Sequence, residues 1–307
     1  MNAPRTIAEY LAQLRDALRG ADPALIQDAL YDAEEHLRAE LAEQPGRSEA
    51  EMLAQVVGSY GAPEEVAELY RDQEIKIQRA LRPPPAPKRR SLLGRFFGVA
   101  ADVRAWGALF YMLLALGTGI AYFVLVVVGL SMSAGLSVLI IGIPFIVLFF
   151  GVVRAMSLME GRIVEAMLGV RMPRRPPYPA QSGSLLQRIG AMFTDWRTWT
   201  TMFYMVLMLP LGIAYFTLTV TLMTMALAFM TLPLARLVDI DGINRLFANG
   251  TITIDWGFGP HAPGWGELVA LGVIGVLLFF GTLHLVRAIG QLQGQLAKHL
   301  LVAGAGH

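Results

Sequence analysis

Acidic and histidine side chains are the groups in this sequence that could bind a metal, and they occur together in two short stretches. Glu35, His36 and Glu40 lie in "EEHLRAE", and Asp239 and Asp241 lie in "DIDG". On a helix Glu40 can face His36 but Glu35 cannot, and zinc usually takes three or four protein ligands. The "DIDG" pair lacks the later ligands and the final Glu of a calcium loop. We therefore expect no metal site and interpret the first stretch as solvated helix surface.

Catalytic and cofactor-binding motifs are not found in the sequence either. It contains no phosphate-binding loop, no H-E-x-x-H, no nucleophile elbow and no glycine-rich dinucleotide motif. It also contains no cysteine, which excludes disulfides, thiolate catalysis and cysteine-ligated metals. We expect a protein that is not an enzyme and has no cofactor.

Charged and tryptophan residues recur at matched positions in two similar segments of the chain, and this recurrence is more informative than the metal and catalytic motifs. "SLLGRFFGVAADVRAWGALFYMLLALGTGIAYF" from Ser91 and "SLLQRIGAMFTDWRTWTTMFYMVLMLPLGIAYF" from Ser184 are identical at 17 of 33 positions, at a constant offset of 93 residues. Shared apolar residues alone would not keep charges in register, so we interpret the chain as containing an internal repeat. The matched residues are Asp102, Arg104 and Trp106 in the first copy and Asp195, Arg197 and Trp199 in the second.

These six residues are our candidate interface or coupling residues, together with Arg154, Glu160 and Arg287. "LFFGVVRAMSLMEGR" and "LFFGTLHLVRAIGQLQGQ" place Arg154 and Arg287 at an offset of 133 residues, and Glu160 then matches Gln293. Each Trp stands where an aromatic belt residue belongs, at the start of an apolar segment. We expect the Asp and Arg side chains to meet lipid headgroups or the matching pair of the other copy.

The apolar segments predict four membrane spans. Stretches of 49, 38 and 19 uncharged residues follow Arg104, Arg197 and Glu267. A span takes roughly 20 apolar residues, so we place spans at ~106–130, ~135–156, ~199–222 and ~266–287, with an outer loop at ~223–265. Asn249-Gly250, between Leu246-Phe247 and Ile252, indicates a hairpin in that loop, and paired glycines such as Gly117 and Gly119 indicate close helix packing.

Charge is distributed unevenly along the chain. Residues 1–82 have a net charge of −7, residues 83–104 and 154–197 each have +4, and residues 231–267 have −2. Because basic loops stay in the cytoplasm, we place both termini there and the 231–267 segment outside. "RPPPAPKRR" predicts a stiff linker over residues 83–90.

Residues 1–82 predict a compact helical domain. Asp22 precedes Pro23 as a helix N-cap, and Ser48 and Glu51 form a capping box. "YLAQLRDAL", "DAEEHLRAEL" and "LAQVVGSYGAPEEVAELY" resemble the HAAS signalling domain of bacterial membrane proteins. The resemblance implies a cytosolic module that often occurs beside PadR-like transcription regulators.

Residues 91–300 resemble a sensor domain of bacterial membrane proteins, which also occurs on some actinobacterial histidine kinases. The likeness lies in "FYMLLALGTGIAYFVLVVVGLSMSAGLSVLIIGIPF", "EAMLGV" and "DWRTWTTMFYMVLMLPLGIAYF". We expect an all-α protein with a small cytosolic helical domain (1–82) before a four-helix transmembrane domain made of two parallel helical-hairpin repeats. The first repeat covers residues 91–183 and the second 184–307, and each opens with an interface helix.

The expected function is that of a non-enzymatic sensor in the bacterial inner membrane, which couples an envelope or membrane cue to a cytosolic regulatory protein. Its expected partners are the lipid bilayer and, by resemblance, a PadR-like regulator bound to residues 1–82, with no direct contact to nucleic acid. A transporter or channel subunit, a scaffold that recruits a cytosolic partner, and a homo-oligomer are left open.

Overall fold

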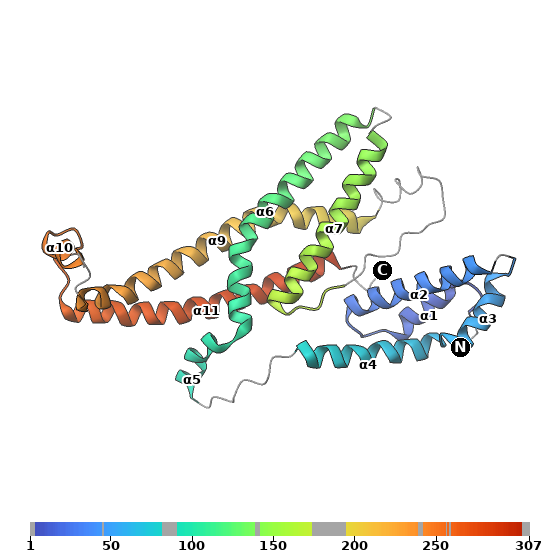
Figure 1. Ribbon diagram of the computed structural model, residues 1–307, viewed down its shortest axis with the longest axis horizontal. Helices are drawn as coiled ribbons and strands as arrows, with labels where there is room; N and C mark the ends of the chain where they lie inside the picture. Colours follow the sequence, from blue (N-terminus) through green and yellow to red (C-terminus); the bar gives the residue numbers. More distant parts are fainter. Residues whose placement is uncertain are drawn as a thin grey trace. The chain divides into compact units, whose positions relative to one another are not determined.

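A computed structural model describes residues 4–44, 46–81, 91–138, 142–173, 195–238, 242–255, 257 and 259–302. Within these residues the protein is all-α, and its one β feature is an isolated bridge between Ile254 and His261. Small N-terminal helices precede four long apolar ones, as the sequence predicts (Figure 1). The predicted linker at 83–90 and most of the second interface helix, residues 184–194, lie outside the described residues.

Local cap chemistry sets the N-terminal helices α1 (Ile7–Ala17), α2 (Pro23–Glu43), α3 (Glu49–Ser59) and α4 (Pro63–Leu81). The Asp22 carboxylate accepts the Ala24 N–H at 2.9 Å. Ser48 and Glu51 form the predicted capping box, in which each side chain accepts the backbone N–H of the other. Both caps confirm the sequence predictions, because each depends only on residues within one helical turn.

One apolar core joins α1, α2, α3 and α4. The Tyr10 hydroxyl crosses this core and donates to the Gly61 carbonyl at 2.9 Å, which joins α1 to the turn before α4. Full burial of each large side chain contributes about 1.5–3 kcal/mol, so the core holds the four helices together. Its largest fully buried members are Tyr10, Leu14, Leu18, Leu37, Met52 and Leu53.

Four helices of the described chain are long and apolar enough to cross a membrane. They are α6 (Val103–Leu136), α7 (Gly142–Leu168), α9 (Trp196–Leu237) and α11 (Trp265–Leu301). Large apolar side chains are exposed along all four, for example Phe110, Leu148, Phe203 and Val273. Such a surface is costly in water and stable in lipid, so the protein is a membrane protein.

The chain divides into two compact units, and each long helix other than α7 contributes to both. The first unit comprises residues 1–85, 119–208 and 291–307. It therefore contains the N-terminal helices, α7, and one part each of α6, α9 and α11. The second comprises residues 86–118 and 209–290, and it contains the remaining parts of those helices with α10 (Ile243–Ala248).

The helices end later than the spans that we expected. α6 continues to Leu136 and α7 begins at Gly142, so the first turn lies several residues beyond the expected one. α9 continues to Leu237 through the segment where we expected the outer loop from ~223. Hydropathy marks where a membrane ends, whereas a helix ends only where its backbone hydrogen bonds stop, so the two boundaries need not coincide.

The interface helix of the first copy is present as α5 (Leu92–Phe97), followed by a 3₁₀ turn, η1 (Gly98–Ala101). The rings of Phe96 and Phe97 lie against Phe280 of α11, at centroid distances of 6.0 and 4.8 Å. His284 of α11 lies 3.0 Å from the Phe96 carbonyl oxygen through Nε2. These contacts fix α5 against α11, while Leu93 and Val103 stay exposed.

The segment between α9 and α11 corrects the predicted hairpin. Residues 243–248 are helical, and Asn249 and Gly250 end that helix. Gly250 has φ 68°, its N–H donates to Phe247 O, and the Thr251 N–H donates to Leu246 O. This is a Schellman cap, which needs a left-handed glycine just as a tight hairpin turn does. The same Asn-Gly signal therefore serves a helix end.

Glycine lets α6 and α9 approach closely at one point of the second unit. A Cβ on Gly212 would lie 2.3 Å from the Ala115 carbonyl oxygen, which is a backbone clash. A Cβ on Gly117 would meet nothing within 4 Å, so our interpretation of Gly117 as a packing position was wrong. Lipid-exposed glycine and packed glycine look alike in sequence, because both occur within apolar runs.

Candidate functional site

Asp102 and Asp195 cap α6 and α9 in the same way. The Asp102 carboxylate accepts the Arg104 N–H at 3.0 Å, and the Asp195 carboxylate accepts the Arg197 N–H, also at 3.0 Å. The carbonyl oxygen of each Asp also accepts the N–H three residues later. The D-x-R spacing of each copy is thus a helix N-cap, in which a carboxylate satisfies an orphan N–H and complements the helix dipole.

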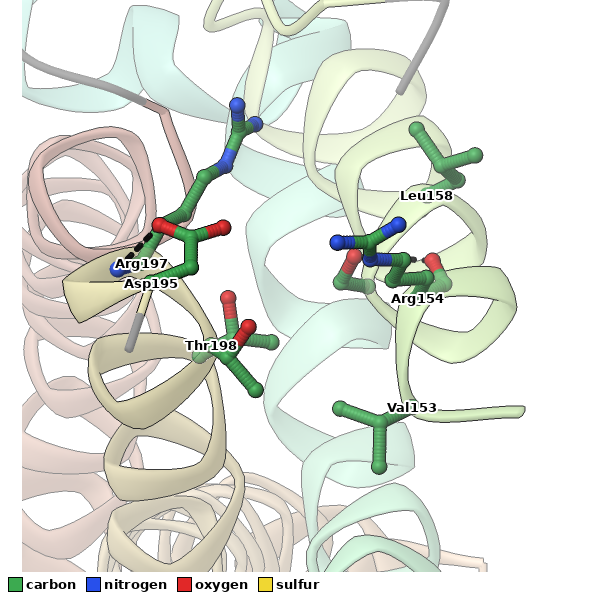
Figure 2. Close-up of a pocket in the computed structure, with 8 residues that line it drawn as sticks. Val153, Arg154, Leu158, Asp195, Arg197 and Thr198 are labelled. Carbon is green, nitrogen blue, oxygen red and sulfur yellow. Dashed lines mark hydrogen bonds between the residues drawn. The ribbon is translucent and has the colours of Figure 1, made fainter. Parts of the chain in front are cut away.

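Asp102 also forms an ion pair with another predicted site residue. Its second carboxylate oxygen lies 2.9 Å from Nη1 of Arg287 on α11. By sequence offset, the matching residues are Asp195 and Arg154. These two residues line a cleft, in which Figure 2 shows them on opposite walls. Among the described residues no ion pair joins them.

The remaining predicted residues at the helix starts have distinct surroundings. Arg197 donates through Nη2 to the Leu301 carbonyl at 2.9 Å, near the end of α11. The Trp106 indole N–H donates to the Ala100 carbonyl at 2.8 Å, and its ring lies 6.5 Å from that of Phe279. Trp106 and Trp199 are 37% and 44% exposed, which suits belt residues.

Glu160 is the centre of a buried polar cluster. It is 1% exposed and accepts the hydroxyl hydrogens of Tyr122 at 2.9 Å and Tyr204 at 2.8 Å. The Gln293 amide donates to the Tyr204 hydroxyl at 3.1 Å. We call Tyr122, Glu160, Tyr204 and Gln293 the Glu160 cluster. Its four members come from α6, α7, α9 and α11, so one chain of hydrogen bonds joins all four long helices.

From the sequence, Glu160 is a candidate coupling residue that lies beyond the expected span at ~135–156. The structure instead places it within α7 between two tyrosine hydroxyls. A signal for those tyrosines existed: Tyr204 lies in the repeated "FYM" and Tyr122 in the repeated "GIAYF". Their hydroxyls cannot be assigned a partner from sequence, because the acceptor lies 38 or 44 residues away.

Arg171 forms a second polar cluster, which the sequence analysis missed. Its guanidinium lies 3.2 Å from Asp28 of α2, 3.3 Å from Glu74 of α4 and 3.5 Å from Glu165 of α7. We call these four residues the Arg171 cluster. Their side chains are between 7% and 16% exposed. Removing one partner of an ion pair so far from water leaves a buried charge unpaired, which costs several kcal/mol.

A second contact joins the N-terminal helices to a long helix. The Lys298 ammonium near the end of α11 lies 2.5 Å from the Asp22 carboxylate, which also caps α2. Together with the Arg171 cluster it joins α2 and α4 to the ends of α7 and α11. No sequence motif marks Arg171 or Lys298, because their partners lie 143 and 276 residues away.

Several titratable groups outside the spans have raised pKa values, among them Tyr70 and His261. Burial raises the pKa of Tyr70 above its usual range, and Asp32, which accepts its hydroxyl at 3.1 Å, raises it further. A hydrogen bond to Glu267, 2.8 Å away, raises the pKa of His261 in the exposed segment before α11. Burial is the larger cause of the Tyr70 shift, and in both groups a neighbouring carboxylate also favours the protonated form.

The residues weighed as metal ligands in the sequence are not gathered into a ligand set within the described part of the chain. The His36 ring stacks on Tyr60 at a centroid distance of 4.4 Å. Asp239 and Asp241 lie outside the described residues. In the part that the structure covers, no three His, Cys, Asp or Glu side chains lie together as a metal site would require.

Comparison with protein families gave two matches. A family model described as "Putative sensor" matches residues 111–301, and one described as HAAS matches residues 9–68. The first match contains all four residues of the Glu160 cluster, and Asp28 of the Arg171 cluster lies in the second. Neither the curated proteins nor the solved structures gave a significant match.

Proposed function

We propose a specific role for this chain on the premise that it belongs to the family described as "Putative sensor", whose model covers most of its length. With a HAAS domain before the membrane helices, it is a signalling-type membrane protein. The role we propose is non-enzymatic coupling: a cue in the envelope or membrane changes the packing of the four helices, and residues 1–82 convey that change to a cytosolic regulatory protein.

The observation that carries this proposal is the Arg171 cluster. Arg171 follows the end of α7 by three residues, and its guanidinium binds carboxylates of α2 and α4. A displacement at the end of α7 therefore moves a charge that is shared between two helices of the HAAS domain. Three carboxylates surround one guanidinium, so a small movement changes their mutual repulsion steeply.

The Glu160 cluster explains how a change in one helix would reach α7. A buried hydrogen-bond network is satisfied in few arrangements, and a partly satisfied one is costly. A shift of α6, α9 or α11 would thus have to carry α7 with it or break a bond to Glu160. Suppose that the four helices have two packings, each with its own position of the HAAS helices. A cue that binds one packing more tightly than the other would then shift the population toward that packing and its HAAS position.

The proposal includes a location and a partner. The chain lies in the bacterial cytoplasmic membrane with both termini in the cytoplasm, and a regulator of the PadR-like kind binds residues 1–82. The acidic charge of that segment and its HAAS match support a protein partner more than nucleic acid, which basic surfaces bind.

Substitution of Arg171 tests the coupling directly. In Arg171→Gln, Asp28 and Glu74 lose the guanidinium that they share. We therefore expect faster hydrogen exchange in α2 and α4 and an altered transcriptional response of the host cell. Arg38→Gln is the matched control, because Arg38 pairs with Glu34 of the same helix and its side chain is 36% exposed. A surface pair of this kind contributes little.

Deletion of residues 1–82 separates coupling from the alternatives. The deleted protein should still insert into the membrane but should give no regulatory output. A transcriptional response that survives the deletion would overturn the proposal. A response that is lost on deletion but unchanged by Arg171→Gln would favour a scaffold, which recruits its partner without receiving a signal from the membrane helices.

A further inference from the structure

The cleft between α7 and the start of α9 has the chemistry of an anion site. Its walls carry the guanidinium groups of Arg154 and Arg197, the carboxylate of Asp195, and hydroxyls of Ser157, Thr198 and Thr201. Figure 2 shows Arg154 facing Asp195 and Thr198 across the opening. Two cations and one anion leave a net charge of +1, which suits a singly charged oxyanion.

One donor atom of a residue that lines this cleft has no partner among the described residues. Arg197 Nη1 is buried and makes no hydrogen bond among the described residues, although Nη2 of the same group binds Leu301 O. A buried guanidinium nitrogen without an acceptor costs free energy. An oxygen atom from a bound anion would satisfy it.

The matched positions of the other copy show that the polar lining is particular to this cleft. At the offsets of 93 and 133 residues, Thr198, Thr201 and Ser157 correspond to Ala105, Ala108 and Gly290. There, Asp102 and Arg287 close directly on one another at 2.9 Å. In the cleft, by contrast, no ion pair joins the corresponding charges among the described residues, and three residues with hydroxyl groups are added to the lining.

The cleft lies at the ends of apolar segments of the chain, and this position indicates a lipid headgroup as the source of the anion. Arg154 ends the uncharged stretch of 49 residues, and Arg197 begins that of 38. Side chains at the ends of apolar spans lie at the depth of lipid headgroups, where basic pockets bind phosphate. The cavity volume is only ≈ 30 Å³, so the cleft admits the oxygens of a headgroup rather than a whole ligand.

We propose that this cleft binds the phosphodiester of a phospholipid headgroup. Arg154 and Arg197 donate to the phosphate oxygens, and the hydroxyls of Thr198 and Thr201 supply further donors, while the Ser157 hydroxyl donates to the Arg154 carbonyl at 2.8 Å. The bound lipid joins α7 to the start of α9. The site is separate from the Arg171 cluster and does not depend on the signalling role.

Thermal unfolding of the full-length protein in detergent tests the site, with dioctanoylphosphatidylglycerol as the probe. Binding to the folded state alone raises the unfolding temperature with lipid concentration. Dioctanoylglycerol, which has the same chains but no phosphate, should have no such effect. Inorganic phosphate should act only at much higher concentrations, because it lacks the chains that hold the headgroup at the cleft.

Substitutions identify the residues. We expect Arg154→Gln to weaken the lipid effect at least about tenfold, since it removes a charge-assisted hydrogen bond. Arg287→Gln, which breaks the closed pair at the matched position, should leave the effect unchanged. If Arg154→Gln lacks a cooperative transition, Ser157→Gly combined with Thr198→Ala, the residues of the other copy, replaces it and should also weaken the effect.

Three results would overturn the proposal. An equal shift with dioctanoylglycerol would show that the acyl chains alone bind. An equal lipid response in Arg154→Gln and the unmodified protein would place the binding elsewhere. Stabilisation by inorganic phosphate at the lipid's own concentrations would exclude the lipid as the particular source of the anion.

Discussion

Glu160 shows how much one side chain can determine in an apolar bundle. Its carboxylate accepts hydrogen bonds from tyrosines of two other helices, and one of those tyrosines accepts from Gln293 of a third. In lipid, packing between helices is driven by van der Waals contact and by such polar bonds, because the tails are as apolar as leucine. Glu160 therefore specifies which faces of the helices meet.

Removal of this carboxylate gives a prediction at the scale of the residue. Glu160→Ala leaves two buried tyrosine hydroxyls without their acceptor, and we expect it to lower the free energy of unfolding by about 2–4 kcal/mol. Thermal unfolding in detergent would measure the loss. Glu68→Ala, at an exposed position of α4, is the control and should change the stability by less than about 0.5 kcal/mol. Equal stability of the two variants would contradict a structural role for the cluster.

At the scale of the element, the close contact between α6 and α9 gives a second prediction. Gly212→Ala places a methyl group against the Ala115 carbonyl oxygen, where a Cβ would lie 2.3 Å away. α6 and α9 must then separate, and overpacking of this kind costs about 1–3 kcal/mol.

The control for this prediction lies in the same pair of helices. Gly117→Ala meets nothing within 4 Å and should be neutral or slightly stabilising, because alanine favours a helix more than glycine does. The thermal unfolding temperatures of the two variants, measured in the same detergent, separate the cases. If Gly212→Ala is as stable as Gly117→Ala, α6 and α9 do not approach at this point.

The elements also show which features the sequence could predict. Asp22 and Ser48 were assigned as caps because a cap depends on residues within one turn of helix. The end of α9 at Leu237 was not predicted, because the segment beyond residue 222 is as compatible with a continuing helix as with a surface segment. The pair of Asp102 with Arg287 was not predicted, because the expected partners were lipid headgroups or the Asp195 and Arg197 of the other copy. The Arg171 cluster was missed entirely. Contacts between residues more than a hundred positions apart carry no local pattern.

At the scale of the whole molecule, the distribution of charge predicts the orientation of the chain in the membrane. The basic residues lie beside the N-terminal end of the first span and between the second and third spans, whereas residues 231–267 are acidic. Four spans return the chain to the side on which it began. Both the HAAS domain and the end of α11 should therefore lie in the cytoplasm. The Asp22–Lys298 contact requires only that the two lie on the same side of the membrane.

The absence of cysteine allows this orientation to be tested without altering the native sequence further. Single substitutions Thr251→Cys, Glu64→Cys and His299→Cys lie at exposed positions of the segment between α9 and α11, of α4 and of α11. We expect a membrane-impermeant maleimide to label Thr251→Cys in cells with an intact cytoplasmic membrane and an outer layer permeable to the reagent. The other two should react only after the membrane is opened. Labelling of Glu64→Cys in intact cells would place the HAAS domain outside, where no cytosolic regulator could reach it, and labelling of His299→Cys alone would require an odd number of spans.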